Sequence, residues 1–241
     1  MQRIEDLKIK IFADGANLGD ILELSKLPYI KGFTTNPSLM RKAGVVDYEA
    51  FARDLIALVP DKPISFEVFA DDFPSMIAQG RKIASWGKNV NVKVPITTTN
   101  SESTGLVIQA LASEGVVVNV TAVFTLDQVK AIIKVLDPKV TAIVSVFAGR
   151  IADTGVDPTQ FMRDCVYILN DYSSQLHRLL WASPREVLNI FQADQVGCHI
   201  ITCTSDLLAK LSLAGKDLTE YSLETVRMFH KDARASAFSI N

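Results

Sequence analysis

The chain has 241 residues, 48% of them hydrophobic and 22% charged, and its formal net charge is −2. That size and apolar content support one large globular domain or two small ones. The basic residues are dispersed, which predicts no nucleic-acid partner, and the absence of any run of 18 uninterrupted apolar residues predicts no membrane span.

Short runs rich in β-branched residues recur along the chain and predict strands. In chain order these runs are Lys8–Ala13, Ile30–Thr34, Ile64–Phe69, Val90–Pro95, Val116–Thr121, Val140–Phe147, His177–Ser183 and Val196–Thr202. Segments with helical periodicity lie between and after them. These segments include Asp47–Leu58, Pro74–Ser85, Leu126–Leu136, Pro158–Gln175, Pro184–Phe191, Ser205–Leu213 and a last amphipathic stretch, Leu223–Ala237.

Strands that alternate with helices pair in parallel, because each helix carries the chain back across the sheet. The eight predicted strands, in a length close to the ~250 residues of a typical (β/α)8 barrel, predict an α/β TIM barrel. A doubly wound open sheet is the competing fold, but Asp14–Asn17 lacks the GxGxxG turn of a dinucleotide site. We expect one barrel domain over residues 1–241, with 217–241 as a C-terminal helical extension that covers its own barrel or a neighbour's.

The cysteines and histidines give no pattern typical of a metal site. Cys165, Cys198 and Cys203 are odd in number and contain no CxxC pair, so we expect no disulfide framework and a reducing cytoplasmic setting. The three histidines are scattered without ligand spacing. We therefore expect neither a metal nor a cofactor.

Polar residues stand late in the otherwise apolar predicted strands, where a barrel gathers its catalytic groups. They are Asp14, Thr34, Asn36, Glu67, Lys93, Asn119, Thr121 and Ser145, followed by Arg150, Ser183 and Arg185. Individually they have structural explanations: Asp14 fits a helix cap, Asn36 a turn, and Ser183 an N-cap before Pro184. A whole ring of them, with carboxylates, an amine, amides and guanidinium groups, suits a polyhydroxylated anionic small molecule.

Lys93 lies in Asn91–Thr97, a run that predicts a strand buried on both faces. A lysine at a strand end can extend its ammonium group to water. When the lysine is buried instead, the environment favours the neutral amine, which is a nucleophile toward carbonyl carbons. Arg150, Ser183 and Arg185 follow the late strands, where barrels often bind phosphate, so a sugar phosphate can span the lumen from this anchor to Lys93.

Three motifs resemble the transaldolase family, which includes the fructose-6-phosphate aldolases, and the resemblance covers nearly the whole chain. They are Thr34–Leu39 (TTNPSL), Val92–Pro95 (VKVP) followed by Thr97, and Ser145–Ile151 (SVFAGRI), in family order on the expected strands. The resemblance implies a (β/α)8 barrel and a lysine Schiff-base enzyme that acts on sugar phosphates. It also implies an oligomer, since the family commonly forms one.

The resemblance also implies a role for each matched residue. Lys93 would form an imine with the ketose C2 carbonyl, and Asp14 would act as general acid/base at the C4 hydroxyl. Glu67 and Thr121 would hold a water that shuttles protons. Asn36, Asn119 and Ser145 would bind substrate hydroxyls, and Phe124 would be a further substrate-binding residue. Arg150, Ser183 and Arg185 would bind the phosphate.

Two activities of the family start from the same enamine. Glu67, Phe124 and Ser145 resemble transaldolases, whereas the aldolase has Gln, Tyr and Ala at these places, so dihydroxyacetone transfer is the favoured expectation. A fructose-6-phosphate aldolase-like lyase is the alternative, and a non-catalytic sugar phosphate binder is a third. The loop Thr97–Thr104 is longer than the family's usual link, which leaves the identity of the acceptor open.

Overall fold

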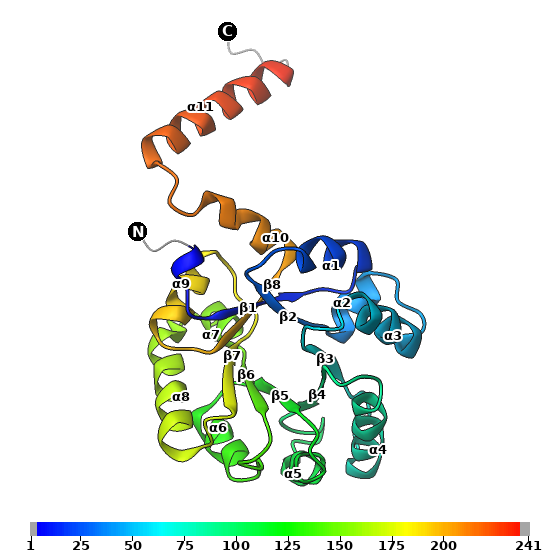
Figure 1. Cartoon of the computed structure of the whole chain (residues 1–241). Coiled ribbons are helices and arrows are strands. Elements are labelled where there is room, and N and C mark those ends of the chain that lie inside the picture. The colour runs from blue at the N-terminus through cyan, green and yellow to red at the C-terminus, as the bar shows by residue number, and fades with distance from the viewer. Residues whose placement is uncertain (1–3, 237–241) are drawn as a thin grey trace.

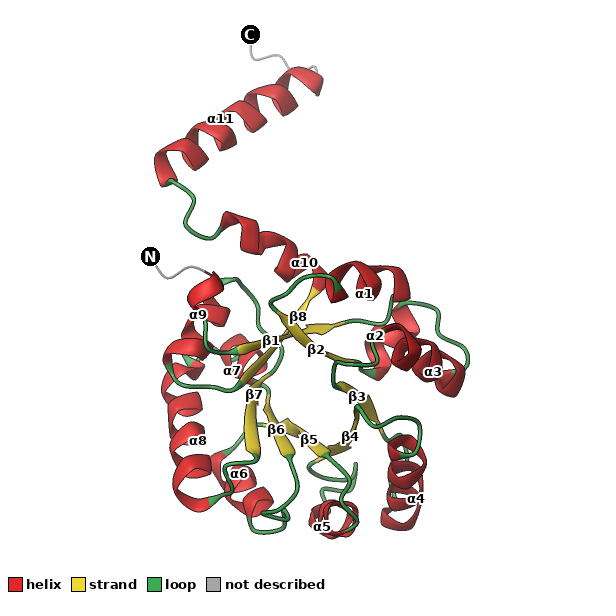
Figure 2. Cartoon of the chain, viewed as in Figure 1, coloured by secondary structure: helices red, strands yellow, loops and turns green. Residues whose placement is uncertain are grey.

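The computed structural model describes residues 4–236, and its eight parallel strands close into one barrel in the order β1 to β8 (Figure 1, Figure 2). The strands are β1 (Lys10–Asp14), β2 (Ile30–Thr34), β3 (Ile64–Glu67), β4 (Val90–Pro95), β5 (Val118–Val123), β6 (Ala142–Val146), β7 (His177–Trp181) and β8 (Ile200–Thr204). Pairing of β1 with both β2 and β8 closes the ring. This confirms the predicted α/β TIM barrel.

Helices follow the strands and, apart from the last one, surround the barrel (Figure 2). They are α1 (Leu18–Ser25), α2 (Pro37–Lys42), α3 (Tyr48–Leu58), α4 (Phe73–Ala84), α5 (Gly105–Ser113), α6 (Leu126–Ile133), α7 (Ala148–Asp153), α8 (Pro158–Tyr172), α9 (Leu188–Gln195), α10 (Ser205–Ala209) and α11 (Leu218–Ala235). Two 3-10 turns, η1 (Ile4–Asp6) and η2 (Lys210–Leu213), complete the described elements.

The barrel has a large apolar core between strands and helices and a small one inside the ring. The small cluster comprises Phe12, Ile143, Leu180, Ala182 and Ile200. Phe12 is accommodated because Gly32 on the neighbouring strand has no side chain. A Cβ atom at position 32 would lie 2.6 Å from Cζ of Phe12. The small cluster therefore fills part of the lumen with apolar side chains, as expected for a barrel of eight strands.

The prediction of a helix at Pro184–Phe191 was wrong about where the helix begins. The structure places α9 at Leu188–Gln195, so Ser183 is not its N-cap and Pro184 is not its first residue. Ser183 instead has φ of 61°, in the left-handed region, and α9 begins only after another turn of chain. Asn189 fixes the segment that precedes the helix, because its Oδ1 accepts hydrogen bonds from the N–H groups of Arg185 and Glu186.

Other predicted boundaries differ by a few residues. Strand β8 begins at Ile200 rather than at Val196, which is the C-cap of α9. The last helix begins at Leu218, earlier than the predicted Leu223, and is described to Ala235. The predicted end at Ala237 lies outside the described residues.

Helix α11 extends away from the barrel (Figure 1). Its residues are exposed except for Thr225, which is partly exposed. Asp217 caps the helix by accepting the N–H of Glu220 at 2.9 Å. Among the described residues, no helix is both long enough and apolar enough to cross a membrane.

Candidate active site

A cavity of about 320 Å³ opens at the carboxyl ends of the strands. The predicted residues that line it are Asp14, Asn36, Glu67, Lys93, Asn119, Thr121, Ser145, Arg150 and Ser183. Thr34, which the sequence also predicted, lines it as well, together with Leu180, Ala182 and Thr202. Side chains from all eight strands thus meet in one space, because the closed ring turns this end of every strand toward the same opening.

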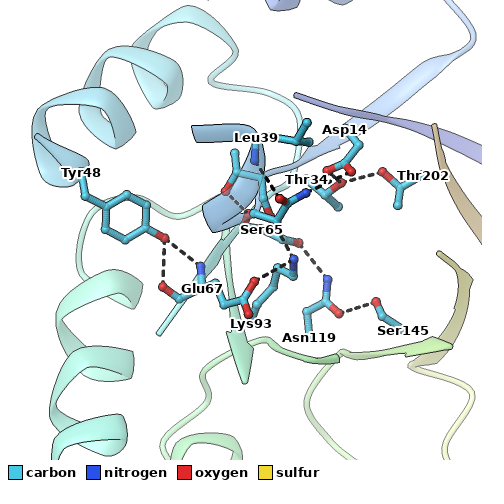
Figure 3. Close-up of polar contacts among 12 residues, drawn as sticks. Asp14, Thr34, Leu39, Tyr48, Ser65, Glu67, Lys93, Asn119, Ser145 and Thr202 are labelled. Atoms are coloured by element: carbon cyan, nitrogen blue, oxygen red, sulfur yellow. Dashed lines mark hydrogen bonds and ion pairs between the residues drawn. The ribbon is translucent and has the colours of Figure 1, made fainter. Parts of the chain in front are cut away.

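Lys93 lies buried in the lumen beside a carboxylate (Figure 3). The β3–β4 register places Glu67 opposite Lys93, and Oε2 of Glu67 is 3.1 Å from Nζ of Lys93. Nζ also donates to the carbonyl oxygen of Thr35 at 2.9 Å. The lysine is therefore held by two acceptors inside the cavity and does not extend its ammonium group to water.

Asn119 and Ser145 form a fixed amide network next to Lys93 (Figure 3). Ser145 Oγ donates to Asn119 Oδ1 at 2.6 Å, and Asn119 Nδ2 donates to Ser65 Oγ at 3.1 Å. Because a hydroxyl group can donate or accept, Ser65 and Ser145 together satisfy both ends of the Asn119 amide and hold it between β3 and β6. The β4–β5 register puts Asn119 directly beside Lys93.

Asp14 accepts hydrogen bonds from two neighbours at the end of β1. Thr34 Oγ1 donates to Asp14 Oδ1 at 2.7 Å, and Asn36 Nδ2 donates to Oδ2 at 3.3 Å. Thr34 Oγ1 also lies 2.6 Å from Thr202 Oγ1. Because Thr34 has one hydroxyl proton, Thr202 donates to Thr34 when Thr34 donates to Asp14.

Burial raises the pKa of Asp14 above its usual range. Glu67 adds to this increase, while Lys93 and the hydrogen bonds from Thr34 and Asn36 oppose it. A carboxyl group in this environment exchanges protons closer to neutral pH than an exposed one, as a general acid/base requires.

The raised pKa of Asp14 predicts a pH dependence of stability. The folded protein binds this proton more readily than the unfolded chain, so the stabilising contribution is present below the ordinary value of 3.8 and is lost as pH rises through the folded pKa. The thermal midpoint of the wild type relative to Asp14→Asn should therefore increase as pH is lowered from 7 toward 4. Scanning calorimetry of both proteins measures this, with the exposed Asp54→Asn as control; a difference that shrinks on acidification would contradict it.

The groups predicted to bind phosphate lie at two places. Arg150 lines the cavity, with its guanidinium carbon 5.2 Å from the Phe147 ring centroid. Phe124, predicted to bind substrate rather than phosphate, is 37% exposed and lies just outside the cavity lining. Its ring centroid is 5.5 Å from that of Phe147. Arg185 is paired instead with Asp153 on the surface, its Nε donating to Oδ1 at 3.0 Å.

Gly149 allows the segment after β7 to approach α7 closely. A Cβ atom at Gly149 would lie 1.5 Å from the carbonyl oxygen of Ser183. We expect Gly149→Ala to lower the free energy of unfolding by about 3 kcal/mol or more, because backbone must move to admit the methyl group. Gly15→Ala, where a Cβ atom meets nothing within 4 Å, should change it by about 0.5 kcal/mol at most. Urea denaturation of the two variants compares them, and equal stability would contradict the prediction.

The long loop Thr97–Thr104 folds back on itself between β4 and α5. Thr97 and Ser103 form an antiparallel bridge, and Thr99 N–H donates to Asp71 Oδ1 at 2.8 Å. The Thr99 hydroxyl donates to the same carboxylate, and these hydrogen bonds lower the pKa of Asp71. The loop is therefore attached to the segment that follows β3.

The structure also brings in residues that the sequence did not identify as part of the site. Ser65 and Thr202 face the lumen, and the alternation of side chains along β3 and β8 could have indicated this. Tyr48 contacts the backbone of Glu67 from α3, and no local pattern pointed to it. Asn36 combines two functions, because its Oδ1 caps α2 by accepting the N–H of Leu39 while its Nδ2 reaches Asp14.

A lysine amine, two carboxyl groups and amide and hydroxyl groups in the lumen define an α/β barrel with a polar pocket for a small molecule. The model of the transaldolase/fructose-6-phosphate aldolase family matches residues 11–240. The chain therefore belongs to this family.

Curated relatives agree with this membership. The probable transaldolase of Dehalococcoides mccartyi (strain ATCC BAA-2266 / KCTC 15142 / 195) is 36% identical over 203 residues, which cover 84% of this chain and 90% of that protein. The probable transaldolase of Thermoanaerobacter sp. (strain X514) is 34% identical over 233 residues, with 96% and 100% covered.

Solved structures share the fold at low sequence identity. A putative lyase/mutase from Burkholderia cenocepacia J2315 has a TM-score of 0.62 at 11% identity, covering 98% of this chain and 88% of that one. The 3-hexulose-6-phosphate synthase from Salmonella typhimurium has a TM-score of 0.57 at 16% identity, with 83% and 89% covered. Both likenesses concern the barrel fold alone.

Proposed function

We propose that this protein is a transaldolase that transfers a dihydroxyacetone unit from a ketose phosphate to an aldose phosphate through an imine on Lys93. The donor is sedoheptulose 7-phosphate or fructose 6-phosphate, and the acceptor is erythrose 4-phosphate or glyceraldehyde 3-phosphate. The observation that carries the proposal is the buried Lys93 amine, 3.1 Å from Glu67 and in one cavity with Asp14.

Imine formation begins when Lys93 gives up a proton and its nitrogen attacks the ketose C2 carbonyl carbon. Glu67 is close enough to accept that proton. Glu67 then returns the proton to the hydroxyl group of the resulting carbinolamine, which leaves as water and gives an iminium ion on Lys93. Glu67 and Thr121 hold the water that carries protons in this step and in the later hydrolysis.

Carbon–carbon cleavage follows from the iminium ion. Asp14 removes the proton of the C4 hydroxyl, the C3–C4 bond breaks, and its electron pair flows into the iminium to give an enamine. The aldose leaves as an aldehyde, and an acceptor aldehyde then reacts with the same enamine in reverse. Asn36, Asn119 and Ser145 bind the hydroxyl groups of the three-carbon unit, and the hydrogen bond from Ser145 to Asn119 supports the role of those two side chains.

The substrate phosphate binds at the side of the cavity opposite Lys93. This role is supported by the presence of Arg150 and Ser183 in the lining of that cavity. Arg185 would join them by exchanging Asp153 for the phosphate, since its guanidinium group is paired in the structure.

Turnover of fructose 6-phosphate, measured with and without erythrose 4-phosphate, distinguishes the transferase from the aldolase. We expect the acceptor to accelerate turnover, because a protected enamine waits for an aldehyde. Equal rates with release of free dihydroxyacetone would instead establish the aldolase, which remains the second candidate because it uses the same lysine, Asp14 and cavity.

Borohydride reduction in the presence of fructose 6-phosphate tests the Schiff base itself. A mass increase on Lys93 by peptide mass spectrometry is the expected result. Unmodified Lys93 in a reaction that consumes substrate would contradict the mechanism. Binding of the sugar phosphate with neither modification nor turnover would favour the non-catalytic barrel.

We also propose a homo-oligomer in which the extension 217–241 contacts a second copy of this chain. Leu218, Val226 and Phe229 are 80%, 59% and 63% exposed on α11, and a lone helix of this length is marginally stable in water. Light scattering of Phe229→Glu should show a smaller assembly than the wild type.

We place the proposed transaldolase activity in the cytoplasm, in keeping with the buried free thiols of Cys165, Cys198 and Cys203.

A further inference from the structure

The end of β3 lacks a strand partner on the side of β2. Pairing between the two strands covers Phe33 with Ile64 and Thr34 with Ser65, after which the chain turns into α2. In a parallel strand, alternate residues direct their N–H and C=O groups to the same neighbour. Ser65 bonds toward β2, since its carbonyl accepts the N–H of Thr35 at 3.1 Å, so Glu67 directs its backbone groups to the same side.

The hydroxyl group of Tyr48 occupies the place of the missing strand (Figure 3). It accepts the N–H of Glu67 at 2.8 Å and donates to the C=O of Glu67 at 3.0 Å. One hydroxyl thus satisfies both backbone groups of one residue, from a helix nineteen positions earlier in the chain. Donation requires the phenol to keep its proton, and burial raises the pKa of Tyr48.

The ring of Tyr48 is fixed by other aromatic rings. Its centroid lies 4.6 Å from Phe69, 5.5 Å from Trp86 and 6.1 Å from Phe66. The hydroxyl is consequently held in position by packing as well as by its hydrogen bonds, and the start of α3 is attached to the end of β3.

Glu67 is the residue through which this attachment reaches the cavity. Its backbone lies between Tyr48 and β4, where Val68 N–H donates to the carbonyl of Lys93 at 3.1 Å. Its carboxylate lies 3.1 Å from Nζ of Lys93, and the two side chains are 18% and 9% exposed. A shift of the Glu67 backbone would therefore change the distance between the carboxylate and the amine.

We propose that Tyr48 is a positioning residue that holds Glu67 at proton-transfer distance from Lys93. The proposal rests on the proposed Schiff-base function, in which that pair exchanges protons. Tyr48 itself does not line the cavity among the described residues and acts only through the backbone of Glu67.

The first test removes only the hydroxyl, with Tyr48→Phe. We expect the rate of borohydride-trapped imine formation on Lys93 with fructose 6-phosphate to fall by about ten- to a hundredfold, because a small misplacement of a catalytic group has large effects. The KM should stay within about twofold, since Tyr48 contacts no substrate subsite. The matched control is Tyr29→Phe, at the amino end of β2, which should trap at the wild-type rate.

The second test repeats the change in a Glu67→Gln background. There Tyr48→Phe should slow trapping by less than about twofold, because the group being positioned is absent. An equal loss in both backgrounds, or a wild-type trapping rate for Tyr48→Phe alone, would overturn the positioning role while leaving the Schiff base intact. If the wild type itself traps nothing on Lys93, the proposed function fails and takes this inference with it.

Stability is separated from positioning by Trp86→Phe. This change loosens the ring cluster but leaves both hydrogen bonds of the Tyr48 hydroxyl, so it should lower the thermal midpoint while slowing trapping much less than Tyr48→Phe does; slowing equal to that of Tyr48→Phe would overturn the proposal. Should Tyr48→Phe fail to fold, Tyr48→His replaces it in both backgrounds, because the donor and the acceptor of a neutral imidazole are different atoms and cannot both reach the backbone of Glu67 as the single phenol oxygen does. The same outcomes then decide.

Discussion

Lys93→Met should reduce turnover of fructose 6-phosphate by roughly a thousandfold or more, because removing the nucleophile of a covalent mechanism removes the pathway itself. The thioether fills similar space but cannot form an imine. Initial rates with erythrose 4-phosphate as acceptor measure the loss, and borohydride should leave the variant without added mass on the peptide that contains residue 93.

Folding of Lys93→Met must be shown independently, since Glu67 loses its cation. The carboxylate borders an open cavity and can hydrate, so we expect a change in the free energy of unfolding of no more than about 2 kcal/mol. Lys31→Met, an exposed strand lysine on β2, is the matched control and should keep full activity. A folded Lys93→Met variant with near wild-type turnover would refute the Schiff-base proposal.

Asp14→Asn should lower turnover by about a hundred- to ten-thousandfold, because the amide cannot take the proton from the C4 hydroxyl. The imine on Lys93 should still form, since Asp14 acts after that step. Trapped protein would therefore accumulate in the variant while product release stops. Mass spectrometry of the trapped complex, together with steady-state rates, separates the two steps.

The contrast between the two variants is the informative result. Asp54→Asn, on the exposed side of α3, controls for loss of one negative charge and should behave as the wild type. If Asp14→Asn turned over within about threefold of the wild type, Asp14 would not be the general acid/base. If it trapped as little as Lys93→Met, its role would lie in imine formation instead.

Several site residues were predictable because their positions follow from local rules. Lys93, Asn119 and Glu67 stand late in runs whose β-branched content predicts buried strands, and parallel strands bring such positions to one end of the sheet. Cross-strand register then places Glu67 opposite Lys93 and Lys93 beside Asn119. The family motifs then implied a chemical role for each of these side chains.

Other features depend on contacts between distant segments. Arg185 follows β7 as expected, yet Asp153 on α7 pairs with it, and nothing near either residue in the chain predicts the pair. The start of α9 was misjudged because Ser183-Pro184 resembles a helix N-terminus. The left-handed φ of Ser183 and its close approach to Gly149 hold that segment outside the helix.

The sequence alone determined the barrel through its alternation of strands and helices, and the family through the three motifs. It also determined the lysine at the centre, through the position of polar residues late in the strands. These patterns can be read locally, because each depends on neighbours within one turn or one strand. The tertiary structure alone decided that Tyr48 completes the end of β3, that Thr202 bonds to Thr34, and that Asp14 is buried enough for its pKa to rise. The reason is that hydrogen-bond partners and desolvation are set by tertiary packing, which joins β1 to β8 when the ring closes and attaches α3 to the end of β3.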